Sequence, residues 1–154
     1  MSIQRKNQKN AILENALSLA METGSEKLFI FTDTEQDCRW VLKSGISKMA
    51  EDDGVHASCG VVLIVPKRSE VKDSEIKKAG YECIRSWSGN QSRFSRVKYA
   101  FLHGVQKELI STDSKVVCVL GPWGKSHLDT ITVHDLALSW SADFPFDPRP
   151  LMAK

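Results

Sequence analysis

The sequence has little of what marks several classes of protein. Its longest apolar run, Gly60–Pro66, is far too short to span a bilayer. The charged N-terminus is not followed by an apolar segment, so no secretory signal is expected. Basic residues exceed acidic ones by only two, 21 against 19, so no strongly basic face for nucleic acid is expected. These absences predict a cytoplasmic protein with neither a membrane nor a nucleic-acid partner.

The four cysteines are widely separated, and no pair has the spacing of a zinc site. Without a secretory signal, reduced thiols are expected. Cys59, Cys83 and Cys118 fall at or beside predicted strands, where a thiol packs as a small apolar group. The sequence therefore predicts neither a metal site nor a cofactor.

The 154 residues, of which 42% are apolar and 26% charged, are typical of one domain with its own core. We assign the domain to residues 1–138 and a tail to residues 139–154. Three prolines in the tail exclude a helix or a central strand there. Its aromatic residues Trp140, Phe144 and Phe146 suit contact with the body of the domain or with a neighbouring subunit.

Helical and extended patterns alternate along the chain, which is typical of a parallel sheet with helices on both faces. Helices are expected at 8–22, 35–49, 69–79 and 91–110, and strands at 27–32, 60–66, 81–87, 115–120 and 130–136. The loop at 121–128 is too short for a parallel crossover, which predicts that the last strand runs antiparallel. Apolar spacing places Met49 and Phe94 on the buried sides of their helices.

Two stretches carry a resemblance to a known family. The first, AILENALSLAMETGSEKLFIFT, combines a helix and a buried strand, and the second, KVVCVLGPWGKSHLDTITVHDL, joins two strands through a glycine loop. They resemble the C-terminal α/β domain of pyruvate kinase. They are also similar to the module that precedes the cyclase domain in archaeal proteins of the diadenylate cyclase family, which implies a regulatory link to cyclic di-AMP. The loop residues that match are Gly121, Trp123, Gly124, Lys125, Ser126, Asp129 and Thr130.

The sequence departs from these families at the residues that carry their chemistry. Pyruvate kinase has a Ser-Gly-Arg-Ser phosphate cradle after the first strand, where this chain has Thr32 to Asp37 with three carboxylates. Carboxylates suit a helix N-terminus but repel a phosphate. The Asp-Gly-Ala and Arg-His-Arg motifs of diadenylate cyclases are absent, so cyclase activity is not expected in this chain.

The resemblance implies the strand order 3-2-1-4-5. The predicted fold is thus α/β, a single three-layer domain with a mostly parallel five-stranded sheet in which the last strand is antiparallel. Ligands of such sheets bind at the carboxyl ends of the strands, where the strand order reverses. That point lies between the first and fourth strands. The candidate ligand-binding residues near it are Thr32, Asp33, Thr34, Ser86, Trp87, Gly121, Trp123, Gly124, Lys125, Ser126, His127, Asp129 and Thr130.

The loop that begins at Gly121 combines backbone amides, a cation, a hydroxyl, an imidazole and an indole, which suits a phosphate, a nucleotide or another anion. The alternative is a hairpin with its polar residues in water. The run from Thr32 to Glu35 suits a magnesium or calcium ion, but it is more typical of a helix cap. Arg85, Arg93, Arg96 and Lys98 form a basic group that is typical of a solvated helix face and would also suit a phosphate.

No convergent catalytic set is apparent. An acid and base group could form from Asp33, His127 and Asp129 only if the fold brings them together. A nucleophile and base pair of Ser126 and His127 is unsuited, because adjacent residues point to opposite sides of an extended chain. We therefore expect no catalytic residues.

The leading hypothesis is a non-catalytic ligand-binding or regulatory domain that recognises a nucleotide or phosphorylated metabolite. The alternatives are a metal-dependent, cyclase-like nucleotide enzyme that uses Asp33, Lys125 and His127, and a protein–protein interaction module. A homo-oligomer is compatible with each.

Overall fold

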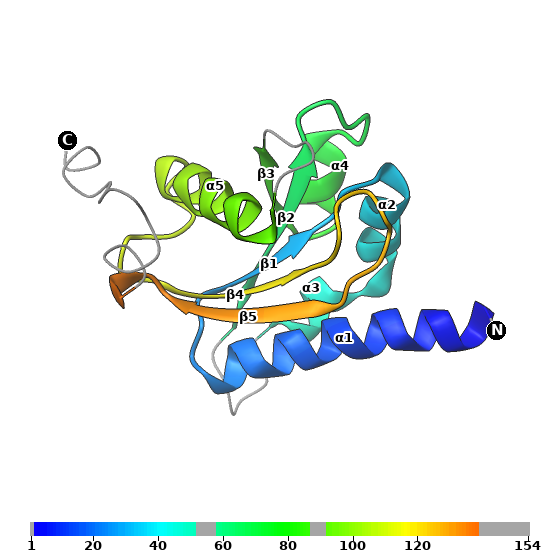
Figure 1. Cartoon of the computed structure of the whole chain (residues 1–154), viewed down its shortest axis with the longest axis horizontal. Coiled ribbons are helices and arrows are strands. Elements are labelled where there is room, and N and C mark those ends of the chain that lie inside the picture. The colour runs from blue at the N-terminus through cyan, green and yellow to red at the C-terminus, as the bar shows by residue number, and fades with distance from the viewer. Residues whose placement is uncertain (1, 52–57, 87–91, 139–154) are drawn as a thin grey trace.

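A computed structural model describes residues 2–51, 58–86 and 92–138 of the chain. The predicted fold class is confirmed: one five-stranded sheet has the order β3-β2-β1-β4-β5, with helices on both faces (Figure 1). The strands are β1 (Lys27–Phe31), β2 (Gly60–Pro66), β3 (Glu82–Ser86), β4 (Lys115–Leu120) and β5 (Thr130–Asp135). The helices are α1 (Ser2–Glu22), α2 (Glu35–Ser44), α3 (Ile46–Met49), α4 (Asp73–Lys78) and α5 (Arg93–Gln106). The tail assigned to residues 139–154 lies outside the described residues.

Strand β1 lies at the centre of the sheet, parallel to β2 on one side and to β4 on the other. Strand β5 pairs antiparallel with β4, with Val133 opposite Val117, as the short loop between the two strands predicts. The strand order reverses between β1 and β4, because β2 and β3 extend from one side of β1 and the later strands from the other. The carboxyl ends of β1 and β4 therefore meet at the predicted switch point.

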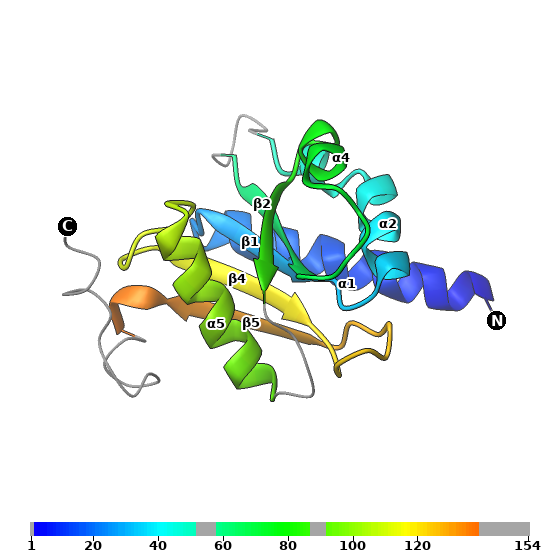
Figure 2. The same ribbon diagram turned by 90° about the horizontal axis from the view of Figure 1, so that it is seen from above.

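The sheet separates two apolar cores. Alternate side chains of β1 point to opposite faces, so that Leu28 and Ile30 belong to one core and Phe29 and Phe31 to the other. The first core packs against α1 to α4, and the second against α5, where the rings of Phe29 and Phe101 make an edge contact at 5.7 Å (Figure 2). Burial on both faces explains why β1 is a continuous apolar run.

Two details of the predicted helices are wrong. The single helix expected over 35–49 is divided at Gly45, whose φ of 78° is left-handed and ends α2. After this change of direction Met49 is 48% exposed instead of buried. Phe94, in the first turn of α5, is expected to face the core but is 49% exposed. Apolar spacing alone does not show at which residue a helix stops packing against the sheet.

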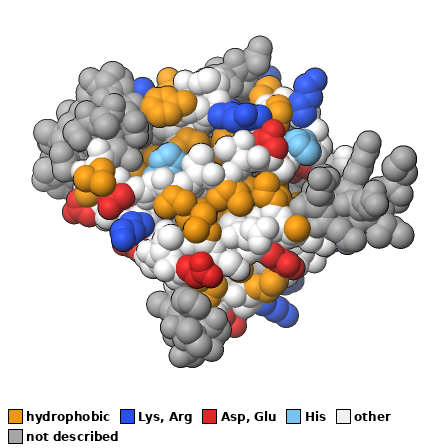
Figure 3. Space-filling model, turned by 60° about the horizontal axis from the view of Figure 1, so that its bottom comes forward, with side chains coloured by type: hydrophobic (Ala, Val, Ile, Leu, Met, Phe, Trp, Pro, Cys, Tyr) orange, Lys and Arg blue, Asp and Glu red, His pale blue; other side chains and the backbone are white. Residues whose placement is uncertain are grey.

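The side of the molecule formed by α1 and β5 carries exposed apolar groups. Figure 3 turns this side forward and shows apolar side chains gathered across its middle. Val133 of β5 is 50% exposed, and Ile12 and Ile131 are only partly buried. None of the described helices has both the length and the apolar character needed to cross a bilayer.

All four cysteines are buried and free of disulfide bonds. Cys59, Cys83 and Cys118 pack in the two cores at or beside the strands, as predicted. Burial raises the pKa of the Cys59 and Cys83 thiols to about 11, because a thiolate is poorly solvated there. Burial likewise raises the pKa values of Cys38 and Cys118.

This burial predicts slow alkylation of the native protein. At pH 8 a thiol with an ordinary pKa near 8.5 is roughly one-quarter thiolate, whereas one with a pKa of about 11 is roughly 0.1% thiolate. Reaction with iodoacetamide should therefore be at least ~100-fold slower in the native protein than in urea. Mass spectrometry over time would measure this difference. Rapid labelling of any of the four thiols in the native state would contradict the described packing.

Candidate functional site

A buried ion pair links α5 to the carboxyl end of β1. The guanidinium of Arg96 donates through Nη2 to Oδ1 of Asp33, the second residue after β1. The side chains are only 5% and 10% exposed, respectively. Arg96 also donates through Nη1 to the carbonyl oxygen of Gly121 at 2.8 Å. One arginine of α5 thus binds both the segment after β1 and the segment after β4.

The second carboxylate oxygen of Asp33 faces the loop between β4 and β5. Oδ2 accepts a hydrogen bond from the backbone N–H of Gly124 at 3.3 Å. Beside it, the hydroxyls of Thr34 and Ser126 lie 3.3 Å apart. Thr34 also caps α2, since its Oγ1 accepts from the N–H of Asp37 at 3.1 Å, which confirms the predicted cap. The start of α2 and the β4–β5 loop are therefore held together by polar contacts.

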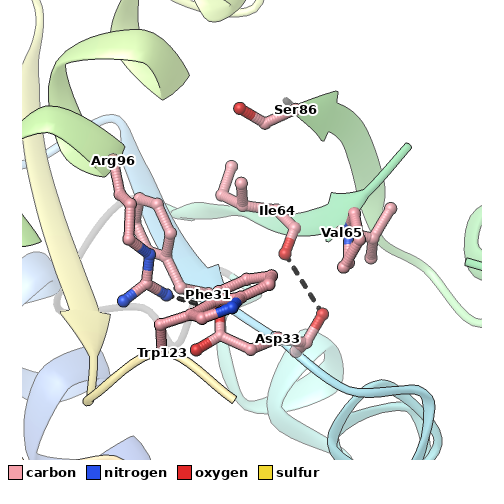
Figure 4. A pocket seen from close by; sticks show the side chains of 9 residues that line it. Phe31, Asp33, Ile64, Val65, Ser86, Arg96 and Trp123 are labelled. Atoms are coloured by element: carbon pink, nitrogen blue, oxygen red, sulfur yellow. Dashed lines mark hydrogen bonds and ion pairs between the residues drawn. The ribbon is translucent and has the colours of Figure 1, made fainter. Parts of the chain in front are cut away.

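Two aromatic rings lie against the Arg96 guanidinium. Its central carbon is 5.5 Å from the ring centroid of Phe31 and 5.5 Å from that of Trp123. Figure 4 shows the Trp123 indole and the Asp33 carboxylate close to the guanidinium that comes down from α5. Aromatic faces stabilise a cation that has lost part of its water. The rings therefore offset part of the cost of burying Arg96.

The carboxylate of Asp33 is less well compensated. Burial raises the pKa of Asp33, and this effect outweighs the opposing attraction of Arg96 and the hydrogen bond from Gly124. Asp37 adds a smaller repulsion in the same direction. The anionic position beside Arg96 is thus occupied at an electrostatic cost.

A small pocket opens beside the ion pair, at the carboxyl ends of β1, β2 and β3. We call it the carboxyl-edge pocket. Its cavity volume of about 20 Å³ is enough for about one water molecule. It is lined by Phe31, Thr32, Asp33, Ile64, Val65, Pro66, Ser86, Arg96 and Trp123. The hydroxyl of Thr32 donates to the carbonyl oxygen of Ile64 at 3.2 Å, which fixes one wall (Figure 4).

The glycine loop is shaped by a close approach of its two ends. A Cβ at Gly121 would lie 1.5 Å from the carbonyl oxygen of His127, so only glycine fits there. The N–H of Asp129 donates to the carbonyl oxygen of Leu120 at 3.1 Å and starts the return into β5. Asp129 forms an exposed ion pair with Arg93 at 3.0 Å and accepts from the Thr130 hydroxyl at 2.7 Å. The loop therefore folds back tightly and brings Trp123 against Arg96.

The predicted site residues divide into three groups. Thr32, Asp33, Ser86 and Trp123 line the carboxyl-edge pocket. Gly121 and Gly124 contact the lining residues Arg96 and Asp33, and Thr34 contacts Ser126 beside them. Lys125 and His127 are exposed on the loop and, like Asp129 and Thr130, do not line the pocket. Trp87 lies outside the described residues.

Arg96 is the residue that the sequence-based interpretation placed wrongly. The sequence predicts a solvated helix face for both Arg96 and Arg93, but Arg96 is buried while Arg93 is exposed. Helical spacing gives no signal for this difference, because both arginines lie four residues before a buried apolar residue, Arg93 before Val97 and Arg96 before Ala100. A buried arginine needs an acidic partner, and Asp33 supplies it.

The geometry does not assemble the acid and base group considered from the sequence. Asp33 pairs with Arg96, and Asp129 pairs with Arg93. Among the described residues, no three His, Cys, Asp or Glu side chains lie together in a way that could hold a metal ion. The polar groups of the pocket are suited to binding a ligand through hydrogen bonds and charge.

Comparison with protein-family models and with curated proteins finds no match to this chain. The function therefore has to be argued from the chemistry of the site.

The two arginines of α5 offer a matched test of the buried ion pair. Arg96→Met should lower the free energy of unfolding by about 3–5 kcal/mol, because it leaves the Asp33 carboxylate buried without its cation. Arg93→Met removes an exposed pair on the same helix and should cost less than ~1 kcal/mol. Urea denaturation would measure both. Equal costs for the two variants would show that the Arg96 pair is not the stronger constraint.

Proposed function

We propose that this domain binds a small ligand in the carboxyl-edge pocket and acts as a non-catalytic regulatory domain. The observation that carries the proposal is the buried Asp33–Arg96 pair, which lies at the switch point of the sheet. Polar groups buried at that edge have no obvious part in joining the two apolar cores. In open α/β sheets this edge is where ligands bind.

The lining of the pocket supports a ligand with a polar head and a flat body. The guanidinium of Arg96 offers planar, charged donors that match phosphate and carboxylate oxygens. The hydroxyl of Ser86 is a further polar group, and Trp123 has an indole face on which a base or another ring can stack. A nucleotide or a phosphorylated metabolite has both chemical parts.

Binding requires the pocket to open. Its present volume of about 20 Å³ is far below that of a nucleotide site, which takes hundreds of cubic ångströms. Trp123 belongs to the β4–β5 loop, where Gly124 and Lys125 are exposed. A movement of this loop would uncover Arg96 and enlarge the pocket, as lids do in other binding proteins.

The metal-dependent nucleotide enzyme is less well supported. That hypothesis needs Asp33 to act together with Lys125 and His127. The Asp33 carboxylate instead faces Arg96 and the Gly124 N–H, while Lys125 and His127 are exposed on the loop. The link to cyclic di-AMP remains a prediction from the resemblance, and the ligand screen below includes this dinucleotide.

A thermal-shift screen tests the proposal. Purified protein would be heated with nucleotides, cyclic dinucleotides, sugar phosphates and uncharged metabolites. A ligand at about a hundred times its dissociation constant adds roughly 2.7 kcal/mol of stability. The shift should decrease at least by half in Ser86→Ala and Trp123→Leu, because both residues line the pocket.

Two further variants locate the site. Lys115→Ala, at the opposite end of β4, is the control and should keep the full shift. Lys125→Ala tests the exposed part of the glycine loop, which the sequence also includes among the candidate ligand-binding residues. A shift lost only in Lys125→Ala would move the site to the loop, and no shift with any compound would overturn the ligand-binding function.

A second candidate function, self-association, is supported by strand β5. It forms one edge of the sheet, and its residues 130–135 include no lysine, arginine, proline or glycine. The N–H of Leu136 donates to the carbonyl oxygen of Ser114, in the segment before β4. In an antiparallel pair every second residue bonds to the partner strand, so the N–H and C=O groups of Ile131 and Val133 point away from β4. The other edge, β3, carries the charged residues Glu82 and Arg85, whereas β5 carries one, Asp135. Among the described residues, no strand pairs with the outer side of β5. Free sheet edges pair readily, and an antiparallel pair of identical strands satisfies two-fold symmetry.

Sedimentation of the purified protein tests this second candidate. We expect a dimer that Val133→Lys converts to a monomer, because a lysine on the edge opposes strand pairing. Tyr99→Lys is the control, since Tyr99 is also exposed but lies on α5. A monomer in the unchanged protein, or a dimer that survives in Val133→Lys, would rule out pairing through β5.

A further inference from the structure

We infer that Asp33 is an internal competitor for the ligand: its carboxylate occupies the anion position of the carboxyl-edge pocket, and a ligand with a phosphate or carboxylate group binds by displacing it. This inference rests on the proposed function. It adds the chemical class of the ligand's head group and a means of regulation.

The groups around the Asp33 carboxylate are those of an anion site. A guanidinium nitrogen of Arg96 donates to one oxygen, and the backbone N–H of Gly124 donates to the other. These donors belong to α5 and to the β4–β5 loop, so they converge from two separate segments on one anion. Charged forks and backbone N–H groups of loops are the usual donors to phosphate and carboxylate ligands. Here a side chain of the chain itself fills that position.

Two of the contacts that hold the β4–β5 loop over this position are long. The Gly124 N–H lies 3.3 Å from Asp33 Oδ2, and the hydroxyls of Thr34 and Ser126 are also 3.3 Å apart. Both contacts join the start of α2 to the β4–β5 loop, and both lie at the outer limit of hydrogen-bond distance. When Asp33 leaves, the first of these contacts is lost with it. The loop that carries Trp123 is then held less firmly, and the pocket can enlarge.

The position of Arg96 explains why a ligand can replace Asp33 without a large change in α5. The Nη1 group of Arg96 stays bound to the Gly121 carbonyl at 2.8 Å, and Phe31 lies against the guanidinium from β1. These contacts do not involve Asp33. The guanidinium therefore keeps its place and exchanges one anion for another.

Competition of this kind lowers the measured affinity. If the pocket accepts a ligand only when Asp33 has left, the apparent dissociation constant equals the intrinsic one divided by the open fraction. Asp33→Asn keeps the shape of the side chain but removes its charge, so it weakens the competitor. The variant should therefore bind an anion more tightly than the unchanged protein, whereas the loss of an ordinary ligand-binding residue would weaken binding.

Titrations with inorganic pyrophosphate and with malonate test this inference and distinguish a phosphate from a carboxylate head group. We expect Asp33→Asn to bind at least one of them about tenfold more tightly than the unchanged protein. Asp113→Asn is the matched control, because it makes the same change of charge in the exposed segment before β4. It should change the dissociation constant less than twofold.

The displacement would be overturned if Asp33→Asn binds each anion no more tightly than the unchanged protein does. It would also be overturned if neither protein binds pyrophosphate or malonate. The proposed function would still stand if the ligand screen gives a shift that depends on Ser86 and Trp123. Should Asp33→Asn fail to fold, nuclear magnetic resonance on the unchanged protein decides. Pyrophosphate should shift the Gly124 amide and the Asp33 carboxyl carbon together, and a shift of neither would contradict the inference.

Discussion

The buried ion pair between Asp33 and Arg96 is the constraint on which the carboxyl edge of this sheet depends. It joins three segments that are far apart in the sequence: the start of α2, the first turns of α5 and the loop between β4 and β5. Taking two charges out of water is costly, and the cost is recovered only when the remaining hydrogen bonds are satisfied. Arg96 meets this condition through Gly121 and two aromatic rings, whereas burial still disfavours the charge of Asp33.

This imbalance connects the stability of the domain with its proposed function. The apolar cores on the two faces hold the sheet together without help from the ion pair. At the switch point, both members of the pair line the carboxyl-edge pocket. In the proposed function, a ligand binds the pocket by replacing the Asp33 carboxylate on Arg96. On that proposal, stability and binding compete for the same guanidinium.

The sequence was sufficient for the fold but only partly for the site. Strand order and the direction of β5 could be predicted because they follow from continuous apolar runs, a short last connection and a resemblance carried by two stretches. Thr32, Asp33, Ser86 and Trp123 could be placed because the ends of strands meet at one edge. The burial of Arg96 was missed because its partner lies 63 residues away, and helical spacing ranks arginine with solvated residues. The exposure of Lys125 and His127 depends on how the loop folds back at Gly121, which spacing does not show.

The crystal structure of the unchanged protein with pyrophosphate bound would test the central claim most directly. The account predicts that pyrophosphate oxygens lie on the Arg96 guanidinium and the Gly124 N–H, and that the Asp33 carboxylate has turned away from both. A complex in which the anion binds while Asp33 remains paired with Arg96 would contradict it.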